Sequence, residues 1–331
     1  QGHLVRVSVP SQAIDVVRED LSSPTARTEV YSNPGDEPVI IASTGFNLGA
    51  TMTRPKSAPA GTRFSAVILL GGDGINDRDG LIAGVSLLGQ LAGTLADAGL
   101  VVVRYDKRGY GQSGGRAESA TIADHAEDAR AVFRWLRDRR DIDPPRIAVV
   151  GHGEGAWVAL LAAARERRIA AVATIAAPAI AGSALVLEQQ RYVLEQTNTP
   201  EADRAAKIEL QTKINAAVVS GQGWAAIPPD IRRQADTPWF QSLLMFDPEK
   251  VVADVRQPML LIHGDLDRQI PVSHLDRLTA LVRKRRSSSR ASGGMCSTCP
   301  VSSSIWMRSS VRRKRPAASA VSSVPSVRSF C

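Results

Sequence analysis

The stretch that most constrains the fold of this chain is the ten residues 148–157. An apolar run ends here in a turn of small residues, Gly-His-Gly-Glu-Gly at 151–155, and a long apolar-periodic pattern follows the turn. That order predicts a buried strand, a sharp turn and a helix. Gly153 stands at the apex of the turn, where a side chain would be lifted above the end of the strand.

A strand, turn and helix of this kind serve two types of site. The pattern G-x-S-x-G holds a nucleophilic serine at its apex and aims backbone N–H groups at the developing oxyanion. The pattern G-x-G-x-G cradles a phosphate in dinucleotide-binding folds, which also need an acidic residue near the end of the next strand to bind a ribose. The next apolar run, residues 169–177, contains no acidic residue. The nucleophile turn is therefore the favoured interpretation, with Gly153 where the serine would stand.

Strand and helix patterns alternate on both sides of this turn, which predicts an α/β fold with a mostly parallel central sheet and helices on both faces. Residues 1–60 are interpreted as a β-rich extension of the same domain with antiparallel strands, and residues 61–286 as its core. The polar, helix-prone stretch at about 179–248 is expected to form an inserted helical lid. The strands expected in the core are 66–70, 100–105, 147–150, 169–175 and 259–263, and the helices are 81–98, 122–137, 154–164 and 272–282.

Residues 287–331 form a tail that is rich in Ser and Arg and has no acidic residue. The net charge is +8 for the whole chain but −4 for residues 1–276, because twelve basic and no acidic residues follow Asp276. The mildly acidic body gives no reason to expect a nucleic-acid partner, and no apolar run is long enough to span a membrane. All three cysteines lie in the tail, and a lone Cys-x-x-Cys is weak evidence for a metal, so no metal or cofactor is expected.

Two interpretations of this tail stay open: a disordered basic segment, or an aberrant segment produced by a shifted reading frame. Read from the third base of each codon, residues 287–300 permit an apolar strand, a turn and a histidine near position 294. As written, the tail is expected to leave the sheet without its last strand, with the edge of the neighbouring strand exposed.

Four ordered segments resemble the α/β-hydrolase superfamily, in its esterase, dienelactone-hydrolase and prolyl-oligopeptidase-like branches. Residues 70–80 are similar to the family's oxyanion segment after a core strand, and residues 106–113 match D-x-R-G-x-G-x-S. Residues 151–155 match G-H-S-E-G except at Gly153, and residues 264–271 are similar to G-x-x-D-x-x-V-P.

This resemblance spans about residues 40–285 and implies the α/β-hydrolase fold. It also implies hydrolysis of a small-molecule carboxylic ester through an acyl-serine intermediate, without a cofactor. The site residues that it implies are the nucleophile position Gly153, the triad acid Asp267, and the backbone N–H donors of Glu154 and of Gly72 or Asp73. Asp265 is the alternative to Asp267 as the triad acid.

The histidine of the family follows the triad acid, and only His274 does so in this chain. His274 falls early in the next helix pattern, so it is expected to be a residue of the helix surface. A second G-x-S-x-G, around Ser113, has no strand before it and no apolar helix after it, and is expected to be an ordinary loop. Asp106 and Arg108 are expected to brace that loop.

The chain is expected to be inactive as written, because it lacks both the serine at position 153 and the family's histidine. Two hypotheses remain: a serine-type esterase whose sequence is altered at two places, and a catalytically silent hydrolase-fold binding module. The sequence begins at Gln1. If a signal peptide preceded this residue, the protein would be secreted or periplasmic. Nothing in the sequence indicates an oligomeric state.

Overall fold

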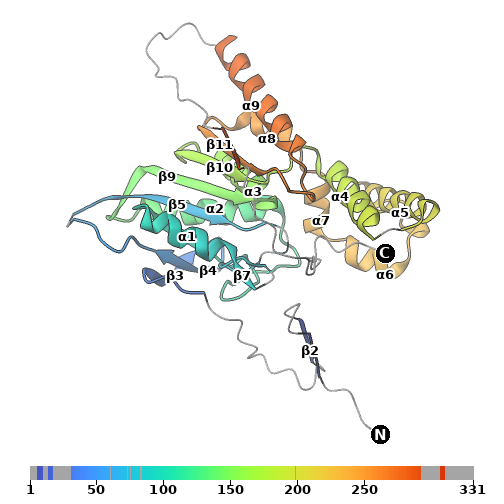
Figure 1. The fold of residues 1–331 in the computed structure, drawn as a ribbon, viewed down its shortest axis with the longest axis horizontal. Helices are drawn as coiled ribbons and strands as arrows, with labels where there is room; N and C mark the ends of the chain where they lie inside the picture. Colours follow the sequence, from blue (N-terminus) through green and yellow to red (C-terminus); the bar gives the residue numbers. More distant parts are fainter. Residues whose placement is uncertain are drawn as a thin grey trace, which may run out of the picture.

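The central sheet positions everything else in the molecule. The computed structural model describes residues 31–291, apart from residues 60, 73, 75, 83 and 198, together with the short strands at 6–9, 14–17 and 306–309. In this part of the chain eight strands form one sheet in the order β12-β11-β10-β9-β5-β8-β4-β3 (Figure 1). These strands are β3 Asp36–Ala42, β4 Asn47–Thr53, β5 Phe64–Leu70, β8 Val101–Tyr105, β9 Ile142–His152, β10 Ala171–Ile175, β11 Met259–Gly264 and β12 Trp306–Ser309.

The strands from β12 to β8 in this order run parallel, and β4 is antiparallel to both β8 and β3. The expected α/β fold, with a mostly parallel sheet and antiparallel strands near the N-terminus, is therefore confirmed. Two further antiparallel pairs lie outside the large sheet. They are β1 Arg6–Val9 with β2 Ile14–Val17, and β6 Leu81–Ile82 with β7 Val85–Ser86.

Helices cover both faces of the sheet. They are α1 Leu87–Asp97, α2 Ile122–Arg137, α3 Glu154–Arg165, α4 Gly182–Gln196, α5 Glu201–Ser220, the 3₁₀ helix η3 Trp224–Ala226, α6 Pro229–Ala235, α7 Pro238–Leu244, α8 Pro248–Asp254 and α9 Ser273–Ala291. Successive side chains of a strand point to opposite faces, so β5 contributes side chains to two hydrophobic cores, one on each face of the sheet. Ile68 belongs to the large core shared with α2 and α3, whereas Val67 and Leu69 pack with Leu88 of α1.

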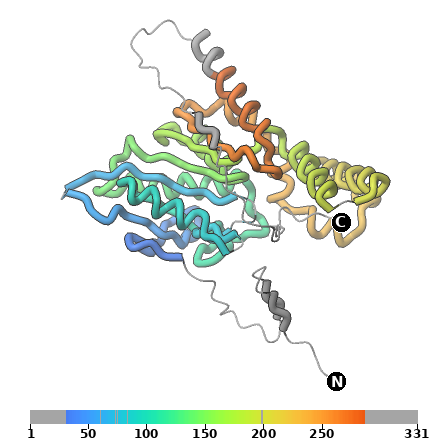
Figure 2. Tube along the Cα trace, viewed as in Figure 1, coloured from blue at the N-terminus to red at the C-terminus, as the bar shows by residue number. Residues whose placement is uncertain are grey.

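The segment between β10 and β11 is helical, as its composition indicates. In Figure 2 the helices α4 to α7 gather in yellow and pale orange beside one end of the central strands. The stacked rings of Trp157 in α3 and Phe246, whose centroids are 4.4 Å apart, join this group to the core. The backbone N–H of Gly182 also donates to the carbonyl oxygen of Phe246 over 2.9 Å, so the two ends of the segment close on each other.

Three details of the fold differ from the sequence-based expectations. Leu81–Ile82 and Val85–Ser86 pair as the β6–β7 hairpin and do not start a helix, because Gly80 and Gly84 take positive φ values of 65° and 79° and turn the chain. Helix α9 continues to Ala291, five residues past the expected end of the core. The strand β12 pairs in parallel with β11, so the sheet has a strand at the edge where none was expected.

His274 was expected on a helix surface, and this prediction is wrong. Its side chain is 3% exposed, because helix α4 covers this end of α9. Its Nδ1 accepts a hydrogen bond from the backbone N–H of Ala179 over 2.9 Å. Its Nε2–H therefore donates to the carboxylate of Glu188, 3.2 Å away on α4. The buried imidazole is thus a structural link between α9 and the helical segment.

Candidate active site

The turn between β9 and α3, where the nucleophile position was expected, has an unusual backbone conformation. Gly153 lies at the start of α3 with φ 56° and ψ −122°, a region that residues with a side chain rarely adopt. Its N–H donates to the carbonyl oxygen of Ile175 over 2.9 Å, and its carbonyl oxygen accepts from the N–H of Ala156 over 3.0 Å. The turn is therefore anchored on both the neighbouring strand β10 and the new helix.

Sterics explain the three glycines of this turn differently. A Cβ atom on Gly151 would lie 2.0 Å from the carbonyl oxygen of Gly155, and one on Gly155 would lie 2.5 Å from that of Leu70. Neither position can hold a side chain unless β9, α3 and β5 separate. At Gly153 the nearest atom to such a Cβ is the Cα of Gly72, at 3.8 Å. Position 153 therefore has room for a side chain, whereas positions 151 and 155 do not.

The loop after β5 lies directly against this turn. Leu70, the last residue of β5, pairs with Gly151 in the sheet. A Cβ atom on Gly72 would lie 2.9 Å from the carbonyl oxygen of His152 and 3.6 Å from the backbone nitrogen of Glu154. The expected oxyanion residues Gly72 and Glu154 are therefore neighbours across the turn. Asp73, the alternative donor, lies outside the described residues.

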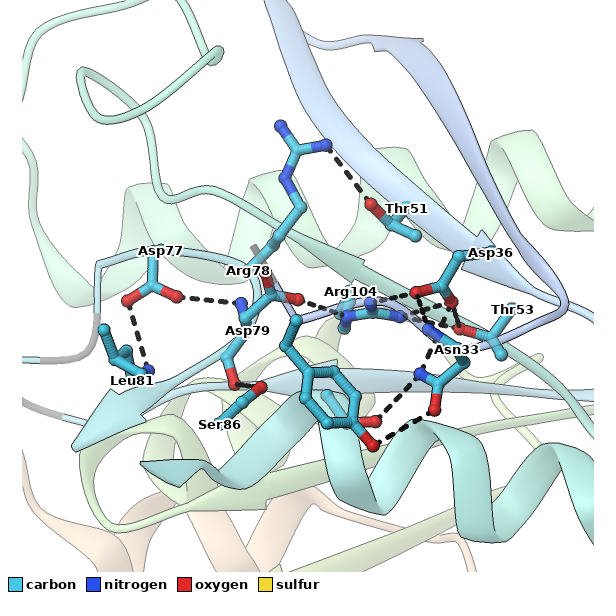
Figure 3. A network of polar contacts seen from close by, with 12 residues as sticks. Asn33, Asp36, Thr51, Thr53, Asp77, Arg78, Asp79, Leu81, Ser86 and Arg104 are labelled. Atoms are coloured by element: carbon cyan, nitrogen blue, oxygen red, sulfur yellow. Dashed lines mark hydrogen bonds and ion pairs between the residues drawn. The ribbon is translucent and has the colours of Figure 1, made fainter. Parts of the chain in front are cut away.

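Two charged clusters hold the rest of the loop in place. Arg104 on β8 is 1% exposed and donates to Asp79 of the loop over 2.8 Å and to Asp36 of β3 over 2.7 Å, as Figure 3 shows. Arg78, which precedes Asp79 in the loop, donates to Asp106 directly after β8 over 2.6 Å. The loop is thereby tied to the sheet on both sides of one peptide bond.

The side chain of Glu154 is buried, and its contacts indicate a structural role. One carboxylate oxygen accepts from the indole N–H of Trp239 over 2.9 Å, and the other lies 3.4 Å from Nζ of Lys107. The same Nζ donates to the carbonyl oxygen of Gly72 over 2.8 Å. These contacts give the Glu154 carboxylate a structural role. For His152, in contrast, Nδ1 is buried and has no hydrogen-bond partner among the described residues.

Asp267 lies in the loop after β11, two strands away from the nucleophile turn. Its Oδ1 accepts from the backbone N–H groups of Gln269 and Ile270, over 3.0 Å and 2.9 Å, so part of its role is to shape this loop. Burial lowers the pKa of His152, and the negative charge of Asp267 acts in the opposite direction. This electrostatic interaction links Asp267 to the nucleophile turn. Asp265 is exposed in the same loop.

The buried imidazole of His125 lines a small cavity near the turn. The cavity measures about 20 Å³, room for about one water molecule, and Gly71, Tyr105, Lys107 and His125 are among its lining residues. Burial lowers the pKa of His125 to about 4, and the positive charge of Lys107 acts in the same direction. His125 is therefore neutral at pH 7.

No described histidine takes the place of the family's catalytic base. His263 is bonded through Nε2 to the carbonyl oxygen of Ile270, and His274 is held by Ala179 and Glu188. The position near 294, where a shifted frame would place a histidine, lies outside the described residues.

The loop around Ser113 has the structural role expected of it. The Ser113 hydroxyl donates to the carbonyl oxygen of Asp106 over 2.7 Å and accepts from the N–H of Gly49 over 3.0 Å. Arg108 donates to the buried carboxylate of Asp128 over 2.7 Å. The bracing roles expected for Asp106 and Arg108 are confirmed.

Two residues at this site were missed by sequence reasoning. Lys107 lies inside a recognised motif, but its sequence neighbours give no sign that it reaches both Gly72 and Glu154. Trp239 follows the helix-starting Pro238 and meets Glu154 across 85 positions of sequence. Only the tertiary fold brings these side chains together.

Within the described residues, no group of three or more His, Cys, Asp or Glu side chains could hold a metal ion. The helices in this part of the chain include none that is long and apolar enough to cross a membrane.

Comparisons with known proteins agree with this geometry. Residues 79–291 match the family described as serine aminopeptidase, S33. The chain is 28% identical over 208 residues to the esterase EstD of Thermotoga maritima, an alignment that covers 62% of this chain and 47% of EstD. It is 35% identical over 126 residues to the uncharacterized protein Rv2307c of Mycobacterium tuberculosis, covering 38% of this chain and 40% of that protein. The chain thus spans about half or less of the length of these relatives.

Solved structures show the same fold at low sequence identity. The Pyrococcus furiosus esterase PF2001 aligns with a TM-score of 0.53 and 17% identity, covering 76% of this chain and 77% of the esterase. The hypothetical protein PA2218 of Pseudomonas aeruginosa aligns with a TM-score of 0.51 and 20% identity, covering 79% and 87%. The chain therefore belongs to the serine aminopeptidase S33 family and has the α/β-hydrolase fold.

Proposed function

We propose that this chain carries the active-site framework of a serine-type carboxylic ester hydrolase, and that it does not turn over as written because Gly153 stands at the nucleophile position. The observation that carries the proposal is the positive φ of Gly153, a conformation that residues with a side chain rarely adopt, together with the room for a side chain at this position. A side chain held in such a conformation is strained, and strained residues cluster at active sites, where a nucleophile must be held clear of the sheet.

In this proposal each site residue has a defined task. The backbone N–H of Glu154, with that of Gly72 or Asp73, stabilises the oxyanion, and Asp267 orients a histidine supplied by the restored C-terminus. The helices α4 to α7 act as a lid over the carboxyl ends of the strands. The contact of Gly72 with the turn, and the charge of Asp267 acting on His152, support these assignments.

The chemistry follows once a serine stands at position 153. Its hydroxyl oxygen bonds to the ester carbonyl carbon, and its proton passes to the imidazole. The ester C–O bond breaks, and the imidazolium gives this proton to the leaving alcohol. Water then hydrolyses the acyl-serine with the help of the same base. The esterase name of the relative EstD supports an ester substrate over an amide.

The test compares four proteins: the chain as written, Gly153→Ser, the chain with its reading frame corrected near codon 287, and the combination. A fluorophosphonate probe reports a reactive serine, and a p-nitrophenyl acyl ester reports a burst and turnover. We expect no burst from the chain as written and little from Gly153→Ser alone, since an unassisted hydroxyl is a weak nucleophile. The combination should turn over, and Asp267→Asn on that background should reduce kcat by about 10⁴.

Two outcomes contradict the proposal. Strong labelling of the chain as written, at Ser113 or any other serine, would show that the nucleophile lies elsewhere. A combined variant that folds but neither labels nor turns over would favour the alternative, a silent hydrolase-fold binding module. The absence of an Oγ at Gly153 is the observation that keeps this alternative in view.

A further inference from the structure

Three elements from distant parts of the chain meet at one buried ion pair beside the nucleophile turn. Lys107 follows β8, and its backbone N–H donates to the carbonyl oxygen of Asn76 in the loop after β5, over 2.8 Å. Its Nζ donates to Gly72 of the same loop over 2.8 Å and lies 3.4 Å from Glu154. The side chains of Lys107 and Glu154 are only 13% and 4% exposed. Lys107 thus holds the loop that would supply an oxyanion donor.

The helical segment above the site reaches the same ion pair from the other side. Trp239, on α7, donates its indole N–H to the second carboxylate oxygen of Glu154 over 2.9 Å. Glu154 therefore divides its two oxygens between Lys107, which follows β8, and Trp239 of the helical segment. A buried carboxylate that loses one of its two donors is strongly unfavourable, because little water can replace the lost hydrogen bond.

His125 and Asp77, which line the adjoining cavity, do not compete strongly with the ion pair of Lys107 and Glu154. His125, which lines the adjoining cavity, is neutral because burial and Lys107 hold its pKa at about 4. Asp77 lines the same cavity, but its carboxylate accepts from the N–H groups of Asp79 and Leu81 within its own loop. The side chain of Lys107 contacts the carbonyl oxygen of Gly72 and the carboxylate of Glu154.

We propose that Lys107, Glu154 and Trp239 are positioning residues that couple the seating of α7 to the geometry of the oxyanion site, an inference that rests on the proposed hydrolase function. With α7 seated, Trp239 fixes one oxygen of Glu154, and the other helps to hold Nζ of Lys107 against Gly72. When α7 lifts, Glu154 turns both oxygens toward Lys107 and draws Nζ away from Gly72. The loop after β5, which carries Gly72, is therefore held in place only while α7 is seated.

The first test needs no catalytic activity and uses the chain as written. The tryptophans are labelled with 5-fluorotryptophan, and the ¹⁹F resonance of Trp239 is assigned with Trp239→Phe. Lys107→Met should shift that resonance and lower its exposure to solvent, since Glu154 then keeps the indole of Trp239 as its side-chain donor. Lys56→Met is the matched control, because Lys56 forms an exposed ion pair with Asp97. It should leave the resonance unchanged.

The second test asks whether the coupling reaches the chemistry, in the variant with both Gly153→Ser and the corrected frame. Trp239→Phe should lower kcat by about tenfold with little change in KM, a part of the 10²- to 10³-fold effect of losing one oxyanion donor. Trp224→Phe is the control, because Trp224 lies in the same segment but contacts Arg232. Lys107→Arg, which keeps the charge, should retain more of kcat than Lys107→Met.

The two tests separate this inference from the function that it builds on. A combined variant without turnover would refute the hydrolase proposal, and the ¹⁹F measurement would still decide the coupling. If the Trp239 resonance stays in place in Lys107→Met and also in Glu154→Gln, while both variants keep the urea unfolding midpoint of the parent, the coupling is absent. A fall in kcat of equal size in Trp239→Phe and Trp224→Phe would likewise overturn it.

Discussion

At the scale of single residues, Gly151 and Gly153 look alike in the sequence, but the structure favours glycine at the two positions for different reasons. At Gly151 the reason is space, since a Cβ atom there would lie 2.0 Å from a backbone oxygen of Gly155. At Gly153 the reason is only conformation, with a positive φ of 56° and open space above the Cα atom. The framework therefore leaves no space for a side chain at 151, whereas at 153 it has the space but makes a side chain conformationally costly.

This difference gives a stability prediction for two alanine variants. Gly153→Ala should lower the free energy of unfolding by ~1–2 kcal/mol, the cost of a side chain at positive φ. Gly151→Ala should cost ~3 kcal/mol or more, because β9 and α3 must separate to admit the methyl group. Urea unfolding followed by circular dichroism measures both changes. Equal losses in the two variants would show that the steric distinction is wrong.

At the scale of elements, the buried guanidinium of Arg104 joins β8 to β3 and to the loop after β5. Arg104 is shared between Asp36 and Asp79, and Thr53 on β4 accepts a third hydrogen bond from it over 2.6 Å (Figure 3). A buried charge with this many partners is costly to break, because removing one partner leaves the guanidinium partly unpaired. The cluster thereby fixes the loop that carries Gly72.

The contacts of Asp36 with Arg104 predict how the stability of the fold depends on pH. Burial raises the pKa of Asp36, but hydrogen bonds from Arg104, Asn33 and Thr53 outweigh it and hold this pKa below its ordinary value of 3.8. A carboxyl whose pKa is lower in the folded state stabilises the fold above its unfolded pKa, and this stability is lost as the pH falls through the folded value. We therefore expect Asp36→Asn to be less stable than the parent at pH 7 but to lose less stability between pH 5 and pH 3.

Urea unfolding midpoints at several pH values measure this difference. Asp97→Asn is the control, because Asp97 forms an exposed ion pair with Lys56. Parallel curves for the parent and Asp36→Asn would contradict the prediction.

How far the sequence predicts these elements depends on the range of the interactions that form them. The apolar run of β5 and the 3.6-residue period of α2 are local signals, and both elements form where expected. The short β6–β7 hairpin depends on two positive φ values at Gly80 and Gly84, which a helix-like pattern hides. The burial of His274 could not be predicted, because the helix α4 that covers it is 86 positions away.

The candidate site was predictable to the same extent. Motif order places Gly72, Gly153, Glu154 and Asp267 at one end of the parallel strands, and the structure has Gly72 against the turn of Gly153 and Glu154. The side chains that hold this backbone, Lys107 above all, are recognisable only through their contacts. Chain order thus predicts the candidate positions, whereas the supporting contacts depend on packing between segments.

At the scale of the whole molecule, the edge of the sheet beyond β10 leads to a prediction about self-association. β11 pairs with β10 on one side and with the four-residue strand β12 on the other, in a register from Leu261 opposite Trp306 to Gly264 opposite Ser309. The core side chain of Leu261 is 1% exposed. Without β12, the backbone N–H and C=O groups along one side of β11 would lack partners.

Two truncations of the chain test the importance of this edge. Ending the chain after Ala291 removes β12, whereas ending it after Ser309 keeps β12 and removes only residues 310–331. An unpaired strand edge is a template for pairing with another molecule, so the shorter chain should self-associate and unfold at a lower urea concentration. The longer one should remain monodisperse to the same degree as the full chain. Light scattering and urea midpoints compare the three proteins at equal concentration. If the two truncations behave alike, β12 does not protect the sheet, and the edge of β11 is covered by something other than strand pairing.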